Sequence, residues 1–323
     1  MDAITVYREL FLSYLRSKIL IKEPKGLYDP IAYILQLRAK RMRPILVLMA
    51  TDLFGEEPKK ALDAALAIEI FHNFTLIHDD IMDAAPLRRN QPTVHEKWDI
   101  NTGILSGDAM LIQAYQCFES YSPLVNKQLI TLFSKTALEI CEGQQYDVEF
   151  ETRDDVTIDE YLKMIEFKTA VLVAAALQMG AIIGGASAED QEHLYNYGRL
   201  LGIAFQLQDD YLDAFGNPET FGKQVGGDII ENKKTYLYLE ALLNGSETDK
   251  TTINELFSAT AISDTKVDTV KEIFVRSKAD LSIKAEIKRY TDKAFYELDQ
   301  INVSPKRKKG LKQFGESLMH REE

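Results

Sequence analysis

Apolar residues recur at intervals of three and four along most of this chain of 323 residues. That spacing gathers them on one side of an α-helix, whereas a half-buried strand needs strict alternation, and no stretch alternates convincingly with period two. Long helical patterns occupy 61–75, 134–151 and 158–183, and two more share the segment 280–320. Pro58 and Pro44 are expected near the starts of two helices, and Asp228 is expected to cap another. The pattern predicts an all-α fold of roughly a dozen helices.

The composition, 46% apolar and 27% charged, is that of a folded chain with a large core. Length alone would suggest two domains, but no composition shift or Pro/Gly/Ser-rich linker separates them, so we predict a single domain over 1–323. The net charge of −12 argues against nucleic acid as a partner. An anionic substrate would therefore need local basic groups or a metal.

The sequence predicts a cytoplasmic protein. Its two cysteines, Cys117 and Cys141, supply no CxxC spacing, and the first 25 residues carry charges throughout, unlike a secretory signal. The most membrane-like stretch, 170–186, is interrupted by Gln178 and contains three glycines. We expect a buried core helix there and no transmembrane segment.

A short acidic pattern, two aspartates with a third three positions later, occurs at 79–83 and again at 209–213. On a helix, residues four apart share a face, so the first and last aspartates of each pattern would stack and repel. These are Asp79 with Asp83, and Asp209 with Asp213. Mg²⁺ relieves such repulsion and keeps positions for water and substrate phosphates. The pattern predicts a polyphosphate site clamped between two acidic helix ends.

Basic residues accompany the first acidic pattern. Arg88 and Arg89 are read equally well as neutralising the aspartates or as binding phosphate oxygens. Lys40 and Arg43, three apart, would converge in a helical turn and could hold a second diphosphate without metal. A lone histidine on an apolar face is usually a core residue, but the face of His72 leads to the carboxylates, two turns away.

Near the second pattern, further polar residues gain meaning only from their joint occurrence, because each alone is more often structural or solvated. They are Asp147, Lys168 with Thr169, Gln206, Lys223 in a glycine-bearing loop, and Lys233.

Together these motifs make the chain resemble the trans-type, head-to-tail isoprenyl diphosphate synthases, which include farnesyl and geranylgeranyl diphosphate synthases. The resemblance runs from about residue 40 to 235 and rests on Lys40-Arg41-Met42-Arg43-Pro44, His72, Asp79-Asp80-Ile81-Met82-Asp83, Arg88-Arg89 with Pro92-Thr93, Gly143-Gln144 with Asp147, Lys168-Thr169, Gln206 with Asp209-Asp210-Tyr211-Leu212-Asp213, and Gly222-Lys223 through Asp228 to Lys233 and Thr235. The resemblance implies that each chain folds into a helical bundle with a deep central cavity. It also implies that the protein is a homodimer.

The resemblance also implies roles. Asp79, Asp83, Asp147 and Asp209 would ligate three Mg²⁺ ions, and Arg88, Lys168, Lys223 and Lys233 would help them hold the allylic diphosphate. Lys40, Arg43, His72 and Arg89 would bind isopentenyl diphosphate, and Thr169 and Gln206 would border the reacting carbons. Two departures are visible: Asn90 replaces the glycine that usually follows the paired arginines, and Ala39 replaces one before Lys40. Asparagine tolerates the left-handed conformation, so the turn is expected to survive.

The reaction implied is condensation of isopentenyl diphosphate with dimethylallyl, geranyl or farnesyl diphosphate. Phe74, five residues before Asp79, would form the bottom of the cavity and limit the length of the product chain. The neighbouring Thr75 is small and would not limit the chain further. Family members that make very long chains tend to have a small residue at this position, so the segment favours a C20 product, geranylgeranyl diphosphate, with C15 farnesyl diphosphate as the alternative.

Three other functions compete with this one. A terpene cyclase generally lacks the second acidic pattern and the isopentenyl diphosphate residues. A non-catalytic regulatory subunit tends to lose aspartates from one cluster, and here both are intact. A helical scaffold predicts no Mg²⁺-dependent binding of diphosphates.

Overall fold

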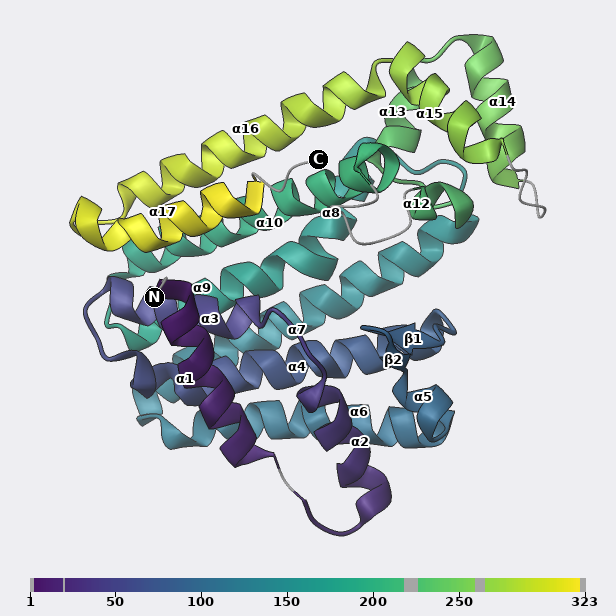
Figure 1. Cartoon of the computed structure of the whole chain (residues 1–323). Helices are drawn as coiled ribbons and strands as arrows, with labels where there is room; N and C mark the ends of the chain where they lie inside the picture. Colours follow the sequence, from purple (N-terminus) through teal and green to yellow (C-terminus); the bar gives the residue numbers. More distant parts are fainter. Residues whose placement is uncertain (1–2, 20, 218–225, 259–264, 320–323) are drawn as a thin grey trace. The chain divides into compact units, whose positions relative to one another are not determined.

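The computed structural model describes residues 3–19, 21–217, 226–258 and 265–319, and most of them are helical (Figure 1). Backbone contacts divide the chain into two compact units. Unit 1 comprises 1–134, 175–192 and 303–310, and unit 2 comprises 135–174, 193–302 and 311–323. The predicted all-α class is confirmed. Four of the five boundaries between the units fall inside helices, and the fifth lies between residues 302 and 303. The single domain over 1–323 stays a prediction.

The elements that lie wholly in unit 1 are α1 (Ala3–Lys18), α2 (Lys25–Gln36), α3 (Met42–Leu53), η1 (Pro58–Ala61), α4 (Leu62–Met82), β1 (Leu87–Arg88), β2 (Gln91–Pro92), α5 (Val94–Lys97), α6 (Ile100–Gln116) and η2 (Cys117–Ser120). Those wholly in unit 2 are α8 (Ile158–Ile165), the π-helical turn η3 (Glu166–Ala170), α12 (Gly227–Ile230), α13 (Tyr236–Asn244), α14 (Glu247–Ser258), α15 (Lys266–Arg276) and α16 (Ala279–Gln300). The helices that contain unit boundaries are α7 (Pro123–Thr152), α9 (Val171–Ile183), α10 (Ala188–Phe215) and α17 (Pro305–Met319).

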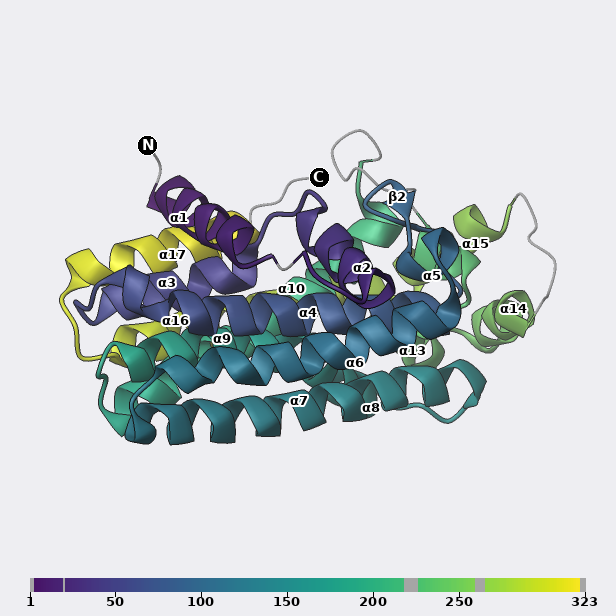
Figure 2. The same cartoon turned by 90° about the horizontal axis from the view of Figure 1, so that it is seen from below.

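Helix α4 is the central element of unit 1. A 3₁₀ turn starts at Pro58, as the sequence predicts, and leads into α4, whose residues are buried along most of its length. Helix α6 runs beside α4 in both views (Figures 1 and 2). Asp99 caps α6, because its carboxylate accepts a hydrogen bond from the Thr102 N–H at 2.8 Å.

Unit 2 has its own apolar core, formed by residues of α8, α10, α13 and α15 among others, and it includes the buried residues Tyr161, Leu207, Leu237 and Phe274. Helix α8 starts at a capping box: the Glu160 N–H donates to the Thr157 hydroxyl, and the Glu160 carboxylate accepts from the Thr157 N–H. This box fixes the start of the helical segment that continues to Ile183.

The segment Ile158–Ile183 is long and apolar enough to cross a membrane by length and composition, yet 67% of its most apolar window is buried inside the structure. In unit 1, Gly180 approaches α3 so closely that a Cβ there would lie 3.0 Å from the Thr51 nitrogen. Close packing through small residues is what the sequence predicts for a core helix.

Several local predictions need correction. The structure contains a hairpin of two short strands, β1 and β2, which the sequence did not predict because no alternating pattern marks it. Helix α3 begins at Met42, not at Pro44, and α12 is capped by Gly226, so Asp228 lies in the first turn of this helix. Gly226 occupies the left-handed region (φ 84°), which a glycine enters without strain.

Candidate active site

The first acidic pattern lies at the C-terminal end of α4. Asp83 is the cap residue, and its N–H donates to the Asp79 carbonyl at 2.8 Å, so the two residues keep the helical i, i+4 relation. The helical relation on which the predicted stacking of Asp79 and Asp83 depends is therefore present. Asp79 is half-buried and Asp83 is exposed, which leaves carboxylate oxygens accessible to a cation.

The middle aspartate, Asp80, has a different role that sequence reasoning missed. Its carboxylate is 1% exposed and accepts two hydrogen bonds from Arg88, one of them from Nε at 2.9 Å. Burial raises the pKa of Asp80, and the Arg88 guanidinium opposes that shift. Asp80 thus anchors Arg88 at the end of α4 that carries Asp79 and Asp83.

The paired arginines are carried by the β1–β2 hairpin. Leu87 pairs with Pro92 and Arg88 with Gln91, so Arg89 and Asn90 form a two-residue turn. Both have positive φ, 54° and 61°, as a type I′ turn requires. The expectation that Asn90 can replace a glycine here is confirmed.

Arg43 and His72 lie in contact, with 3.1 Å between Arg43 Nη1 and His72 Nε2. Desolvation, together with the charges of Arg43, Arg89, Arg41 and Arg88, holds the pKa of His72 well below its usual value. The imidazole is therefore neutral near pH 7 and accepts the N–H of Arg43 at Nε2. Four arginines around one neutral ring give this part of unit 1 a strong attraction for anions.

Besides Nε of the ion-paired Arg41, two buried donors in this group have no hydrogen-bond partner: Nε of Arg43 and Nη1 of Arg89. An unpartnered buried N–H is costly, so nearly all such groups in folded proteins are satisfied. An anion with several oxygens, such as a diphosphate, would satisfy both.

Lys40 is exposed and precedes α3, so the predicted convergence of Lys40 and Arg43 within one helical turn is wrong. The physical reason is Arg41. Its backbone adopts the left-handed conformation (φ 54°), while its guanidinium is buried against Glu69 and the carbonyls of Leu35 and Leu37. No spacing rule reveals such a buried arginine.

His72 supplies a pH-dependent prediction. Its pKa in the folded protein lies below the unfolded value of about 6.5, so acid favours the unfolded chain, which takes up the proton. The neutral His72 therefore costs the folded state no stability above about pH 6.5. Unfolding free energy is lost progressively as the pH falls from there toward the pKa of His72 in the folded protein. In urea denaturation at about pH 7 and pH 5, His72→Asn should lose less unfolding free energy on acidification than the wild type. An equal loss in both proteins would contradict the assignment.

In unit 2, the second acidic pattern lies near the end of α10, with Asp209 and Asp213 half-buried. The main chain of Gly226 and Asp228 donates to Asp213, which joins the start of α12 to this helix. The middle aspartate, Asp210, again has an anchoring role: it accepts a hydrogen bond from the buried Tyr161 hydroxyl. Burial and the Asp228 carboxylate raise the pKa of Asp210 well above its usual range.

The other predicted residues of unit 2 form two direct contacts. Lys168 pairs with Asp147, and the Thr169 hydroxyl donates to the Gln206 amide oxygen at 3.1 Å. Lys233 pairs instead with Glu231 at 2.7 Å and Asp228 at 3.6 Å. Lys223 lies outside the described residues.

The donor set suits Mg²⁺, which prefers a few carboxylates and fills its remaining positions with water and phosphate oxygens. Asp79 with Asp83, and Asp147 with Asp209, are oxygen donors that solvent reaches in part. Within the described segments, no group of three or more His, Cys, Asp or Glu side chains could hold a metal by itself. The carboxylates would then bind a cation together with a substrate rather than form a closed metal cage.

Helical units that carry paired aspartates, buried arginines and a lysine–carboxylate pair define a class of enzyme that acts on diphosphates. The comparisons agree: the model of the polyprenyl synthetase family matches residues 24–275, and the chain belongs to that family. The predicted enzyme class, a trans-type prenyltransferase, is thereby confirmed. Members of this family use Mg²⁺.

The chain is similar to several geranylgeranyl diphosphate synthases. It is 43% identical to that of Methanosarcina mazei over 231 residues, 71% of each chain. A crystal structure of a geranylgeranyl pyrophosphate synthase is 52% identical, has a TM-score of 0.94 and is covered completely, as is this chain. The geranylgeranyl pyrophosphate synthetase structure from Pyrococcus horikoshii Ot3 is 33% identical, with a TM-score of 0.92 over 99% of this chain and 97% of that one.

Proposed function

We propose that this enzyme condenses isopentenyl diphosphate with an allylic diphosphate and releases geranylgeranyl diphosphate, the C20 product. The observation that carries the proposal is the pair of unpartnered guanidinium nitrogens, on Arg43 and Arg89, beside a neutral His72. These donors are suited to a diphosphate that is bound without metal, as isopentenyl diphosphate would be. The C20 product is supported by the names of the relatives.

The allylic diphosphate would be bound by the carboxylate-rich groups and their lysines. Asp79, Asp83, Asp147 and Asp209 would hold Mg²⁺, three ions per site, with the substrate phosphates. Arg88, Lys168, Lys223 and Lys233 would offset the remaining charge of this diphosphate. For this to happen the two acidic patterns must face one substrate, which is the central element of the proposal.

In the reaction, the carbon–oxygen bond of the allylic diphosphate breaks and the electron pair leaves with the diphosphate. Bound Mg²⁺ would supply positive charge that offsets the charge growing on the leaving oxygens. Thr169 and Gln206 would direct their oxygens toward the allylic cation. The double bond of isopentenyl diphosphate then attacks the cation, and a proton passes to the released diphosphate. No side-chain nucleophile takes part.

The test is incubation of the purified protein with isopentenyl diphosphate and, separately, dimethylallyl, geranyl and farnesyl diphosphate, each with Mg²⁺. Chromatography of the dephosphorylated products should show geranylgeraniol as the end product. Farnesol as the end product would select the C15 alternative. No elongation with any starter would overturn the proposal and favour a non-catalytic subunit.

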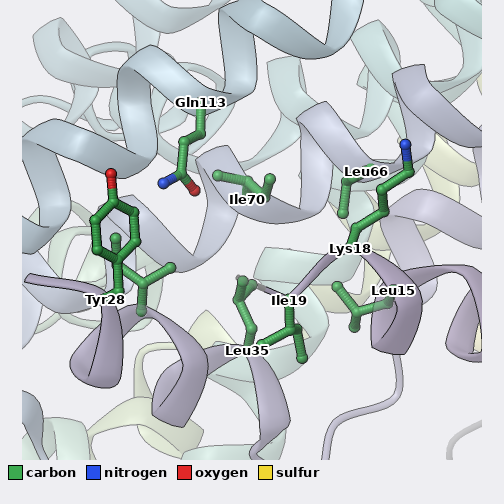
Figure 3. Close-up of a pocket in the computed structure, with 9 residues that line it drawn as sticks. Leu15, Lys18, Ile19, Tyr28, Leu35, Leu66, Ile70 and Gln113 are labelled. Atoms are coloured by element: carbon green, nitrogen blue, oxygen red, sulfur yellow. The ribbon is translucent and has the colours of Figure 1, made fainter. Parts of the chain in front are cut away.

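Phe74 is the proposed floor of the product cavity. It is 9% exposed, and its ring packs against His78 at 4.7 Å and Phe71 at 5.5 Å between centroids. Two residues that lie one and two turns earlier on α4, Ile70 and Leu66, line a small pocket together with Leu15, Tyr28 and Leu35 (Figure 3).

Phe74→Ala is expected to shift the main product beyond C20, because the truncated side chain leaves room for further isoprene units. The measurement is the chain-length distribution of the dephosphorylated products. Thr75→Ser, a small-to-small change at the next position, is the matched control and should leave the distribution unchanged. A C20 product from Phe74→Ala as well would show that this ring is not the floor.

We also propose a cytoplasmic homodimer of single-domain chains. Helix α6 supports the dimer, because it exposes Ile104, Leu105 and Ile112, the last two at about 60%. Large apolar side chains grouped on one helix mark an interaction surface. Light scattering after chromatography should give twice the chain mass of 36.7 kDa. A monomer would contradict this part of the proposal.

A further inference from the structure

The helix that carries Lys168 and Thr169 is not regular. Residues Glu166–Ala170 form a π-helical turn between α8 and α9, closed by a hydrogen bond from the Val171 N–H to the Glu166 carbonyl. We call this segment the π-turn. Such turns hold one residue more than an α-turn and are rare, and they occur frequently at functional sites.

Two glycines of unit 2 lie against the backbone of the π-turn. A Cβ added to Gly143 of α7 would lie 2.7 Å from the Phe167 carbonyl carbon, and one added to Gly202 of α10 would lie 2.7 Å from the Ala170 Cα. No side chain fits at either position without displacing main chain. Glycine is a poor residue for a helix interior, so close backbone approach is the physical reason for both.

Each helix also contacts a polar side chain of the π-turn one turn away from its glycine. On α7, Asp147 follows Gly143 by four residues and pairs with Lys168. On α10, Gln206 follows Gly202 by four residues and accepts the Thr169 hydroxyl.

A third contact comes from the residue three positions before Gly202. Arg199 Nη1 donates to Glu166, the first residue of the π-turn, at 3.2 Å. The π-turn is therefore clamped at its main chain by two glycines, and at its side chains by three polar contacts.

We infer that the π-turn is a positioning device for the reaction, and that Gly143, Gly202, Glu166 and Arg199 are its positioning residues. The inference rests on the proposed function, in which Lys168 and Thr169 act on the allylic substrate. The extra residue rotates the C-terminal part of the helix by about 100° relative to a regular α-helix. That rotation lets Lys168 reach Asp147 of α7 while Thr169 reaches Gln206 of α10.

The decisive variant is Gly202→Ala, whose new methyl group would push the π-turn out of place. A misplacement of about 1 Å at reacting groups can cost on the order of 100-fold in rate. We expect kcat per folded molecule to fall by about 10- to 100-fold. The KM for isopentenyl diphosphate should stay within about twofold, because its proposed residues lie in unit 1. Gly26→Ala is the matched control, since a Cβ at Gly26 meets no atom within 4 Å.

A second pair of variants changes only side chains and adds no atom against the main chain of the π-turn. These variants test its role in the reaction if Gly202→Ala does not fold. Glu166→Gln and Arg199→Gln should each lower kcat several-fold with KM for isopentenyl diphosphate unchanged. The reversed pair, Glu166→Arg with Arg199→Glu, should recover part of the loss.

Wild-type kinetics separate the two hypotheses. A wild type that elongates no allylic starter defeats the proposed function itself. An active wild type whose Gly202→Ala and Glu166→Gln variants match Gly26→Ala in kcat overturns the role of the π-turn alone. If these variants lower the melting temperature but leave kcat per folded molecule unchanged, the role of the π-turn in the reaction is also overturned. Such a result would show that its contacts serve only the stability of the fold.

Discussion

Asp79→Asn and Asp209→Asn are each expected to lower kcat by about 100-fold or more, the largest catalytic effects in this enzyme. Both residues are half-buried aspartates at the ends of long helices, α4 and α10. Asparagine keeps the shape but removes the charge that would hold Mg²⁺ against the leaving diphosphate. Losses of this size occur when a preorganised group that stabilises transition-state charge is removed.

The controls for these variants are aspartates of the same units that lie away from both acidic patterns. Asp29→Asn in α2 and Asp159→Asn in α8 change exposed residues and should leave kcat unchanged. Steady-state assays over a range of Mg²⁺ concentrations provide the measurement. If Asp209→Asn kept wild-type activity while Asp79→Asn lost it, the second acidic pattern would have no part in the reaction.

Glu69→Met is expected to lower the free energy of unfolding by about 3–5 kcal/mol, the largest stability effect among these variants. The Glu69 and Arg41 side chains are only 2% and 3% exposed and form an ion pair, and Asn73 Nδ2 donates to the same Glu69 oxygen at 2.8 Å. Removal of the carboxylate leaves the Arg41 charge buried without its partner. Chemical denaturation measures the effect.

A double-mutant cycle separates the interaction between the Arg41 and Glu69 charges from the packing that each substitution changes. The variant with both Arg41→Met and Glu69→Met should be less destabilised than the sum of the single changes by more than about 1 kcal/mol. Lys288→Met is the surface control: its partner Asp292 is 63% exposed, and the change should cost about 0.5 kcal/mol or less. Strict additivity of the two buried changes would show that the charges do not stabilise each other.

Much of the fold could be predicted because the signals are local. Helical periodicity and Pro58 place the start of α4, and the i, i+4 rule places Asp79 over Asp83. The left-handed tolerance of asparagine anticipates the turn at Asn90. Each of these rests on the residue itself or on neighbours within one helical turn.

The features that could not be predicted depend on partners far along the chain. Arg41 takes a left-handed conformation while its guanidinium is buried against Glu69, 28 residues later, and this shortens the helix on which the Lys40–Arg43 convergence depended. The π-turn depends on close approach by two other helices, and a regular apolar pattern over 158–183 gives no sign of it.

The site shows the same division. The family resemblance assigns Arg43 and His72 to one group and Thr169 and Gln206 to another, and the structure brings the members of each group into contact. The contact between Lys168 and Asp147 was not predicted, because the resemblance gives these two residues different roles. The anchoring contacts of Asp80 and Asp210 were missed, because a motif does not reveal which of its aspartates is turned toward an arginine or a tyrosine. The arginine eight residues after Asp80, Arg88, was the available signal in the sequence.

Titration calorimetry with a non-hydrolysable allylic diphosphate, with and without Mg²⁺, tests most directly the proposal that both acidic patterns bind one diphosphate through Mg²⁺. The wild type should bind the analogue tightly only when Mg²⁺ is present, and Asp79→Asn and Asp209→Asn should each weaken that binding at least about tenfold. Binding that needs no Mg²⁺, or that survives the loss of either aspartate unchanged, would contradict the account.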